Sequence, residues 1–557
     1  MNVRRLFWPV VVLIAASVGA LEFRSAMGET QTWDEGIHIS AGYSYLAFGD
    51  YTWNVEHPPL VKLMSALPLR RMGLVAERRE ADGKLKGQVK YGVDFLYRNR
   101  RDAESILLAA RTPNILLTLL FVFAIAWWTR RRYGPAAGLC AAGLCAFDPN
   151  LIAHGRYVTT DFPVTVFFFF ATVLWVEYLE EAGAVRLLAA SLGIALALVT
   201  KFSAVLLLPV LVLLYFACWI RRQREFPVRR LAITAGTVIG VVALVVALVY
   251  WPDTVRCWRG QAPPLASIAV RKNAIGEALF QLGTLLHLPA HGFLFGLNAV
   301  AEHNDLGHQS YLLGMRSPNG WWYYFPVVYA VKSTMAGLVA TLLLLGAGIW
   351  QVVRRQWISP MTLGLMLTPI FYFAASMSSG INIGMRHILP VYPFLYVGIA
   401  AWVAGAARWK RAGLVGLVGL SVLQIGECAR ITPDYLAFFN EFVGGPGKGP
   451  QYLVDSNLDW GQDLKKLKHW LDAHGAKRAR VYYFGNGQMW YEHIDEGGFP
   501  GPLDQKGWEE VDDYCIANVT PLMGVYVPLD NLAYLRLREP VAKIGWSMYV
   551  YDLRKKK

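Results

Sequence analysis

Long apolar runs constrain the fold of this chain more than any other feature of its sequence. A helix needs about 20 predominantly apolar residues to cross the hydrocarbon core of a bilayer. Runs that approach or exceed this length include those at 6–21, 105–128, 161–180, 203–220 and 231–251. Of the 557 residues, 55% are hydrophobic and only 17% are charged, against about 25% charged residues in an average soluble domain. The sequence therefore predicts a polytopic α-helical membrane protein.

Six further apolar runs bring the predicted number of transmembrane helices to about eleven. They lie at 136–152, 185–199, 322–350, 360–379, 386–407 and 412–428. The first run of the chain follows Arg4 and Arg5 and resembles a signal peptide, but the many later spans favour an uncleaved anchor. We therefore expect a membrane domain over residues 1–428, with two long polar loops at 22–104 and 252–321.

The distribution of basic residues predicts which side of the membrane each loop faces. With a cytoplasmic N-terminus, the clusters in short loops, such as Arg130, Arg131 and Arg132, all fall on the inner side. Both long loops and the C-terminal region then lie outside. The same bias explains the net charge of +14 without nucleic acid as a partner.

The last part of the chain, residues 429–557, lacks the membrane pattern. Its periodicity predicts strands at 481–484, 524–527 and 548–551 and a helix at 464–473, which together indicate a small α/β domain outside the membrane. The spacing of Asp455, Asp459 and Asp463 is interpreted as a solvated acidic face at the start of that helix. Cys257 and Cys515 both fall on the outer side, and spacing alone leaves open whether they form a disulfide.

Ionisable residues beside the spans gather at the predicted outer boundary. Because charged groups are costly in lipid, such positions point to function. The candidates are Asp34, Glu35, Glu56 and His57 in the first loop, then Arg156, Asp161, Lys201, Arg386 and His387 at later outer turns.

Most of these candidates also have a structural explanation. Asp34 and Asp161 would suit the first turn of a helix, and Lys201 would snorkel to the interface. His57 would be a rigid loop residue before two prolines, and Arg386 with His387 would be an interfacial anchor. A metal site is suggested by Glu302, His303 and His308. No second pair of residues at metal-ligand spacing supports such a site.

Five short motifs, taken in order, resemble the GT-C glycosyltransferases. They are Trp33-Asp34-Glu35, His57-Pro58-Pro59-Leu60, the turn from Arg156 to Thr160-Asp161, Thr200-Lys201-Phe202, and Arg386-His387-Ile388-Leu389-Pro390. Over about residues 1–410 the chain is most similar to the protein O-mannosyltransferase and aminoarabinose transferase branch, which is family 39/83-like. The resemblance implies a GT-C fold, a lipid-phosphate sugar donor and inversion at the anomeric carbon. The loop at 252–321 is too short for the β-trefoil of the eukaryotic enzymes, and the C-terminal region looks like that of bacterial family-39 proteins of unassigned acceptor.

The resemblance also implies roles for the candidate residues. Asp34 is the expected general base, with Glu35 in support, because the acceptor hydroxyl must lose a proton as it attacks. The second acidic residue is Asp161. The donor phosphate needs cations, and the expected contacts are Lys201, Arg386 and His387; further substrate contacts are expected from Glu56, His57 and Arg156.

The predicted function is therefore transfer of a sugar from a polyprenyl phosphate to a hydroxyl of a protein, lipid or glycan acceptor. The expected location is a bacterial inner membrane, with the site and the C-terminal domain in the periplasm and membrane lipids as further partners. The alternative is a lipid-linked sugar transporter or flippase without chemistry, which would need a polar path at the midplane. We assign no metal ligand. GT-C enzymes differ in metal dependence, so the resemblance neither implies nor excludes a divalent cation as a cofactor.

Overall fold

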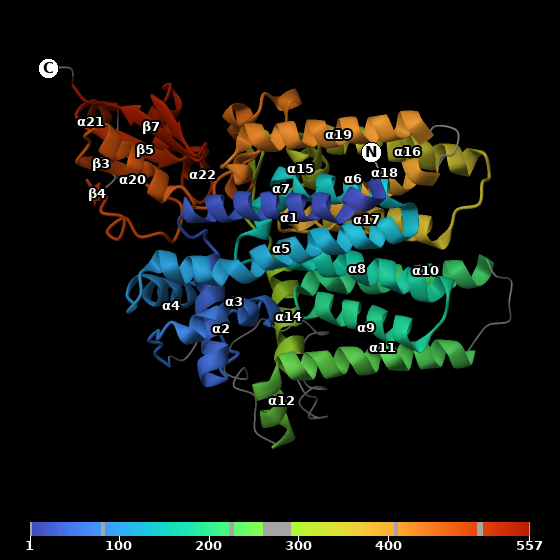
Figure 1. Ribbon diagram of the computed structural model, residues 1–557. Helices are drawn as coiled ribbons and strands as arrows, with labels where there is room; N and C mark the ends of the chain where they lie inside the picture. The colour runs from blue at the N-terminus through green and yellow to red at the C-terminus, as the bar shows by residue number, and fades with distance from the viewer. Residues whose placement is uncertain are drawn as a thin grey trace.

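Long helices that lie roughly side by side form the membrane part of the protein (Figure 1). The computed structural model describes residues 3–78, 84–221, 228–259, 291–405, 410–497 and 505–555. Within these residues, seven helices are long and apolar enough to cross a membrane. They are α1 (Val3–Met27), α5 (Ala103–Tyr133), α8 (Asp161–Glu180), α10 (Leu207–Arg221) with the preceding turn η2 (Phe202–Leu206), α11 (Val228–Val249), α16 (Met335–Val353) and α19 (Lys410–Ile431).

The described residues thus hold seven spans, or eight if one bent pair of helices counts as a span, rather than eleven. The bent pair is α6 (Pro135–Ala146) and α7 (Pro149–Gly155), which meet at 65°. Three other predicted spans are apolar helices of only 15 to 17 residues: α9 (Ala184–Leu198), α17 (Pro360–Ser376) and α18 (Val391–Gly405). At 1.5 Å per residue they rise roughly 22–26 Å, less than the ~30 Å of the hydrocarbon core.

The predicted span at 322–350 is broken by a helix cap that hydropathy does not reveal. Helix α15 (Tyr324–Lys332) ends at Ser333, and the side chain of Thr334 accepts a hydrogen bond from the backbone N–H of Gly337 to begin α16. A capped helix start of this kind separates two helices within one apolar stretch.

The two long loops contain short helices and one hairpin. The first loop forms α2 (Glu35–Phe48), α3 (Leu60–Ala66), η1 (Pro68–Arg71) and α4 (Leu85–Tyr97). The second forms α12 (Trp251–Trp258), α14 (His291–Leu306) and the antiparallel strands β1 (Ser310–Leu312) and β2 (Met315–Ser317). Residues 260–290 of this predicted loop lie outside the described residues.

A five-stranded mixed sheet forms the centre of the C-terminal region. Its order is β4-β3-β5-β7-β6, with β3 parallel to both neighbours and β7 antiparallel to both of its own. The strands are β3 (Arg478–Tyr482), β4 (Asp495–Glu496), β5 (Tyr514–Asn518), β6 (Ala542–Ile544) and β7 (Met548–Asp552); the helices are α20 (Leu464–Ala473), α21 (Gln505–Glu509), α22 (Val519–Leu522) and α23 (Ala533–Arg536).

The expected helix at 464–473 is α20, and two of the three expected strands overlap β3 and β7. The strand predicted at 524–527 was wrong, because Gly524 and Tyr526 have φ of +74° and +63°, which an extended strand does not allow. The strand β5 was not predicted at all. It contains Cys515, which is a free thiol, so the disulfide with Cys257 is not formed.

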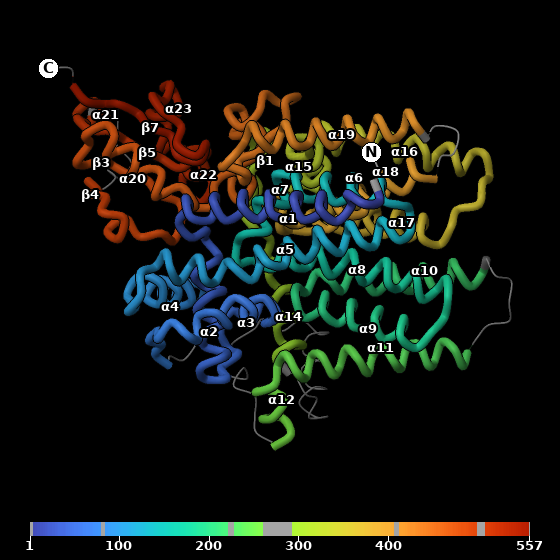
Figure 2. The backbone as a smooth tube through the Cα atoms, in the orientation of Figure 1, coloured from blue at the N-terminus to red at the C-terminus, as the bar shows by residue number. Residues whose placement is uncertain are grey.

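The first loop and the C-terminal sheet lie at the same end of the helix bundle. Figure 2 shows α2, α3 and α4 and the sheet at the left, whereas α5 ends at the right, at its basic residues Arg130, Arg131 and Arg132. The backbone N–H groups of Thr30 and Trp33 donate to the carbonyls of Gln462 and Trp460, both at 2.9 Å. These two bonds join the segment before Asp34 directly to the C-terminal region.

Candidate active site

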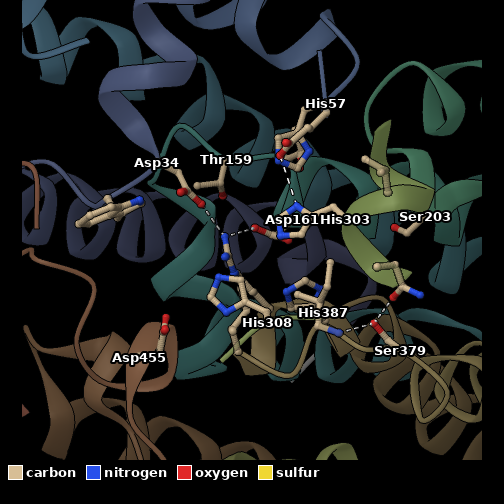
Figure 3. A pocket seen from close by; sticks show the side chains of 18 of the residues that line it. Asp34, His57, Thr159, Asp161, Ser203, His303, His308, Ser379, His387 and Asp455 are labelled. Carbon is tan, nitrogen blue, oxygen red and sulfur yellow. Dashed lines mark hydrogen bonds and ion pairs between the residues drawn. The ribbon is translucent and has the colours of Figure 1, made fainter. Parts of the chain in front are cut away.

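A cavity of about 890 Å³ lies where the first loop, several helix ends and the C-terminal region meet. Most of the predicted site residues line it, as the close-up in Figure 3 illustrates for several of them. The predicted residues that line the cavity are Asp34, Glu56, His57, Asp161, Lys201, Arg386 and His387. Residues that are up to 353 positions apart in sequence thus share one cavity.

Alternating charges connect four of these residues, of which Figure 3 labels Asp34 and Asp161. Arg386 Nη1 lies 2.8 Å from Asp34 Oδ2 and 3.7 Å from Asp161 Oδ2. Lys201 Nζ lies 2.5 Å from Asp161 Oδ1. The carboxylate of Asp161 thus lies beside two cations, Lys201 and Arg386, and Arg386 also pairs with Asp34.

Local backbone structure places each of these side chains at the start of a helix or in a short segment between helices. Asp34 precedes α2 but its side chain caps no N–H of that helix, so its carboxylate is left to Arg386 and the cavity. Asp161 is the first residue of α8, and Lys201 is extended between α9 and η2. Arg386 lies in the short helix η4 (Met385–Ile388), with its guanidinium 4.3 Å above the ring of Trp460. Helix capping and snorkelling therefore do not account for these contacts.

One buried histidine, His38, and two half-buried histidines, His57 and His387, surround the charged residues. Burial lowers the pKa of His38 to about 4, and it also lowers the pKa values of His57 and His387 well below the ordinary value. The three imidazoles are therefore neutral at neutral pH. Nδ1 of His38 and His57 and Nε2 of His387 have no hydrogen-bond partner among the described residues. All three residues line the cavity, so they add polar surface to its wall without adding charge.

Two predicted site residues do not reach the cavity. Glu35 is fully buried and accepts hydrogen bonds from Arg111 Nε and Nη2 at 2.8 and 2.7 Å and from the N–H of Thr32 at 2.8 Å. Arg156 is also buried, and its Nη2 donates to Glu29 Oε1 at 2.8 Å. These ion pairs fix the backbone beside the cavity; no contact of either residue points into it.

Several residues that line the cavity were not among the predicted set. They are His38, His303, His308, Asp455, Trp460 and Tyr526. Tyr526 is stacked on Phe484, and its hydroxyl donates to Asp455. Contacts of this kind between separate segments are not visible in the spacing of the sequence. Glu56 meets one of them, since its Oε2 lies 3.5 Å from His303 Nδ1.

The interpretation of the three C-terminal aspartates as a solvated face was wrong. Asp455, Asp459 and Asp463 are all buried. No α-helix carries these three residues: Asp455 has φ of +58° and begins the short 3₁₀ helix η9 (Asp455–Asn457), and α20 begins only at Leu464. Asp459 accepts hydrogen bonds from Asn518 and from the N–H of Thr520, and burial raises its pKa to about 8. The spacing of four residues reflects buried polar contacts, not a helix surface.

No group of three or more His, Cys, Asp or Glu side chains within the described ranges is arranged to hold a metal ion. Glu56 and His303 form only a pair, and Arg386 occupies the space between the carboxylates of Asp34 and Asp161. A guanidinium here bridges two carboxylates, as a divalent cation does at other sites.

The cavity thus combines a partly exposed carboxylate with two cations and neutral imidazoles. Such a set can accept a proton from a hydroxyl at Asp34 and stabilise a departing anionic group at Lys201 and Arg386. Apolar side chains complete the wall next to η2 and α14, including Val205, Leu206, Leu297, Val300 and Ala301.

Comparison with known proteins gives one family match. Residues 42–258 match the family described as dolichyl-phosphate-mannose-protein mannosyltransferase. Among solved structures, ArnT from Cupriavidus metallidurans bound to undecaprenyl phosphate is similar, with 14% identity over 98% of this chain and 99% of that chain and a TM-score of 0.48. The Archaeoglobus fulgidus oligosaccharyltransferase in complex with Zn and sulfate shows 11% identity over 94% of this chain and 70% of that chain, with a TM-score of 0.45. No curated protein sequence matches the chain.

Proposed function

We propose that the chain is an inverting glycosyltransferase. The premise is that residues 42–258 match the dolichyl-phosphate-mannose-protein mannosyltransferase family, which is a family of membrane glycosyltransferases. The enzyme would move a sugar from a polyprenyl-phosphate donor to a hydroxyl acceptor. The observation that carries the proposal is the contact of Asp34 with Arg386 at 2.8 Å, in a cavity that also holds Lys201 and His387.

Asp34 is proposed as the general base. Its Oδ2 accepts one hydrogen bond from Arg386, and no other hydrogen bond to this carboxylate occurs among the described residues. Its other oxygen is therefore placed to take the proton of the acceptor hydroxyl. The acceptor oxygen forms a bond to the anomeric carbon as the bond to phosphate breaks, and the phosphate leaves with the electron pair. A single displacement of this kind inverts the anomeric carbon.

Lys201, Arg386 and His387 are proposed to bind the donor phosphate. Lys201 and Arg386 are 13% and 12% exposed, so their charges act in a poorly solvated site where they stabilise the leaving anion more strongly than in water. Asp161 would position both cations rather than take part in bond making. His387 lines the same cavity and would offer a neutral contact to a phosphate oxygen.

The remaining predicted residues receive narrower roles. Glu56 and His57 line the cavity and are proposed to contact the donor or acceptor. Glu35 and Arg156 are proposed to position the loop and turn on which Asp34 and Asp161 lie, through their buried ion pairs. The apolar side chains of η2 and α14 would receive the first part of the lipid tail.

The site is proposed to face the periplasm of a bacterium. Residues 1–428 would be the membrane domain and residues 429–557 the periplasmic domain. The basic ends of α5 and α16, with Arg130 to Arg132 and with Arg354 and Arg355, support a cytoplasmic location for that end of the bundle.

A panel of polyprenyl-phosphate sugars, incubated with the purified protein in nanodiscs, tests this function. Mass spectrometry should show consumption of at least one donor and release of the polyprenyl phosphate. If the protein instead moves an intact donor across proteoliposome membranes and consumes none of the panel, the flippase alternative replaces the proposal.

A further inference from the structure

A second group of polar side chains lines the cavity, and the proposed base and phosphate contacts do not use it. The hydroxyl of Tyr526 donates to Asp455 Oδ2 at 2.5 Å and lies 3.3 Å from His308 Nδ1. In the view of Figure 3, His308 lies between Asp455 and the charged residues around Asp161. Asp455 is nevertheless near enough to Arg386 for its charge to raise the pKa of that guanidinium. The group therefore belongs to the same cavity but lies at a different part of its wall.

A column of aromatic rings connects this group to the base. Trp33 is stacked on Phe484 with ring centroids 5.4 Å apart, and Phe484 is stacked on Tyr526 at 5.5 Å. All three residues line the cavity. Aromatic side chains offer a large, rigid contact surface at low cost in conformational entropy. Because Trp33 precedes Asp34, a molecule held against these rings lies next to the carboxylate.

The backbone of both hydrogen-bonded residues is held in an unfavourable conformation. Asp455 and Tyr526 have φ of +58° and +63°, which is rare for residues other than glycine, most of all for a bulky side chain. Asp455 N–H donates to Thr520 Oγ1 at 3.1 Å, and Tyr526 N–H donates to Gln309 Oε1 at 2.8 Å. Such conformations persist only where surrounding contacts impose them, and they cluster at functional sites.

The two parts of the wall differ in charge. Lys201 and Arg386 are the only lysine and arginine among the described residues that line the cavity, and both contact Asp161. The part around Asp455 offers a carboxyl group, a phenol and an imidazole instead. A phosphate anion is favoured at the first part, whereas hydroxyl groups can donate to the carboxyl oxygens of the second.

We propose that Asp455, Tyr526 and His308, with the rings of Trp33 and Phe484, form the acceptor subsite, and that this subsite binds a sugar ring. The acceptor is then a hydroxyl of a glycan or of a glycolipid rather than a Ser or Thr side chain of a peptide. This inference rests on the proposed function, and the reaction is the same. A hydroxyl of the acceptor sugar gives its proton to Asp34 as it attacks the anomeric carbon of the donor.

Saturation-transfer NMR of the full chain in nanodiscs tests the subsite without any donor. The probes are methyl α-mannopyranoside, methyl β-glucopyranoside and methyl β-galactopyranoside at millimolar concentration, and a hexapeptide that contains Thr. At least one glycoside should bind, and Asp455→Asn and Tyr526→Phe should each weaken its binding about ten-fold, the usual effect of losing a hydrogen bond to a charged group.

Matched variants of the same domain control for folding. Asp513 pairs with Arg480 at 2.9 Å and Tyr534 is stacked on Trp508, and neither lines the cavity. Asp513→Asn and Tyr534→Phe should leave glycoside binding unchanged. Binding of no glycoside, equal binding by all variants, or binding of the peptide in an Asp455-dependent manner would each overturn the proposal.

A second measurement separates this inference from the proposed function. With a donor that the wild-type protein consumes, the ratio of glycoside transfer to donor hydrolysis should fall at least five-fold or so in Asp455→Asn. Donor consumption that depends on Asp34 together with glycoside binding that ignores Asp455 refutes the subsite alone. Glycoside binding that depends on Asp455 in a protein that consumes no donor refutes the transferase alone.

Discussion

The ion pair of Glu35 with Arg111 offers a sharp test of which acidic residue of the Trp33-Asp34-Glu35 motif takes part in chemistry. Both side chains have no exposed area. The carboxylate accepts from Arg111 Nε and Nη2 at 2.8 and 2.7 Å and from the N–H groups of Thr32 and Val158 at 2.8 and 3.0 Å. Glu35→Gln keeps the shape but sets an amide nitrogen against these donors and leaves the buried Arg111 charge uncompensated. Breaking one partner of a buried pair costs about 3–5 kcal/mol.

We therefore expect Glu35→Gln to lower the unfolding temperature in nanodiscs by about 3–4 °C. Glu56→Gln is the control, because Glu56 is 43% exposed and lies 3.5 Å from His303, and such a pair contributes at most about 1 kcal/mol. The double variant Glu35→Gln with Arg111→Met should recover part of the loss, since it removes the unpaired charge. A Glu35→Gln protein with the wild-type unfolding temperature and no donor consumption would refute this reasoning and return Glu35 to the reaction itself.

Three further predictions follow from the same contacts. Arg386→Lys keeps the charge but loses the planar guanidinium that lies over Trp460 and whose Nη1 lies near two carboxylates, so kcat/KM for the donor should fall roughly 10–100-fold. Arg430→Lys, at a 67% exposed side chain, should leave kcat/KM unchanged. Lys201→Met should raise the donor KM about ten-fold or more through loss of a phosphate contact, and an unchanged KM would remove Lys201 from the donor site. Burial lowers the folded-state pKa of His38 to about 4, so the unfolded chain binds more protons than the folded chain below pH ~6.5. The contribution of His38 to stability is therefore constant above that pH and falls by up to ~1.4 kcal/mol per pH unit toward pH 4. Because the pKa values of His57 and His387 are lowered as well, His38→Gln should reduce the slope of unfolding temperature against pH in this range without abolishing it, and an unaltered slope contradicts the assignment.

The sequence predicted the grouping of the cavity residues better than the orientation of individual side chains. Four charged residues lie at the ends of apolar runs: Asp34, Asp161, Lys201 and Arg386. Because the helix ends on one side of a bundle lie close together, the sequence predicts that these residues share one site. The sequence did not reveal that Glu35 turns away from the cavity. Its partner Arg111 lies 76 residues away inside an apolar run, and only the folded chain shows that the two side chains meet.

The C-terminal contribution was the part that local pattern could not predict. The positive φ of Tyr526 excludes the strand predicted at 524–527, and Asp455, which was interpreted as part of a solvated face, is buried. Both residues reach the cavity through stacking and hydrogen bonds between segments far apart in the chain, such as the contact of Phe484 with Trp33. Periodicity reports burial along one element, whereas these contacts depend on how separate elements pack.

Donor consumption by Asp34→Asn tests the central claim most directly. Asp34 is 24% exposed and its side chain caps no helix, so this variant should insert and unfold at a temperature close to that of the wild-type protein. An amide cannot take the proton of the acceptor hydroxyl, and loss of a general base lowers the rate roughly 10²–10⁴-fold. In a nanodisc assay by mass spectrometry, the wild-type protein should consume a polyprenyl-phosphate sugar and the variant should consume almost none. Consumption at the wild-type rate by a folded Asp34→Asn protein would contradict the claim.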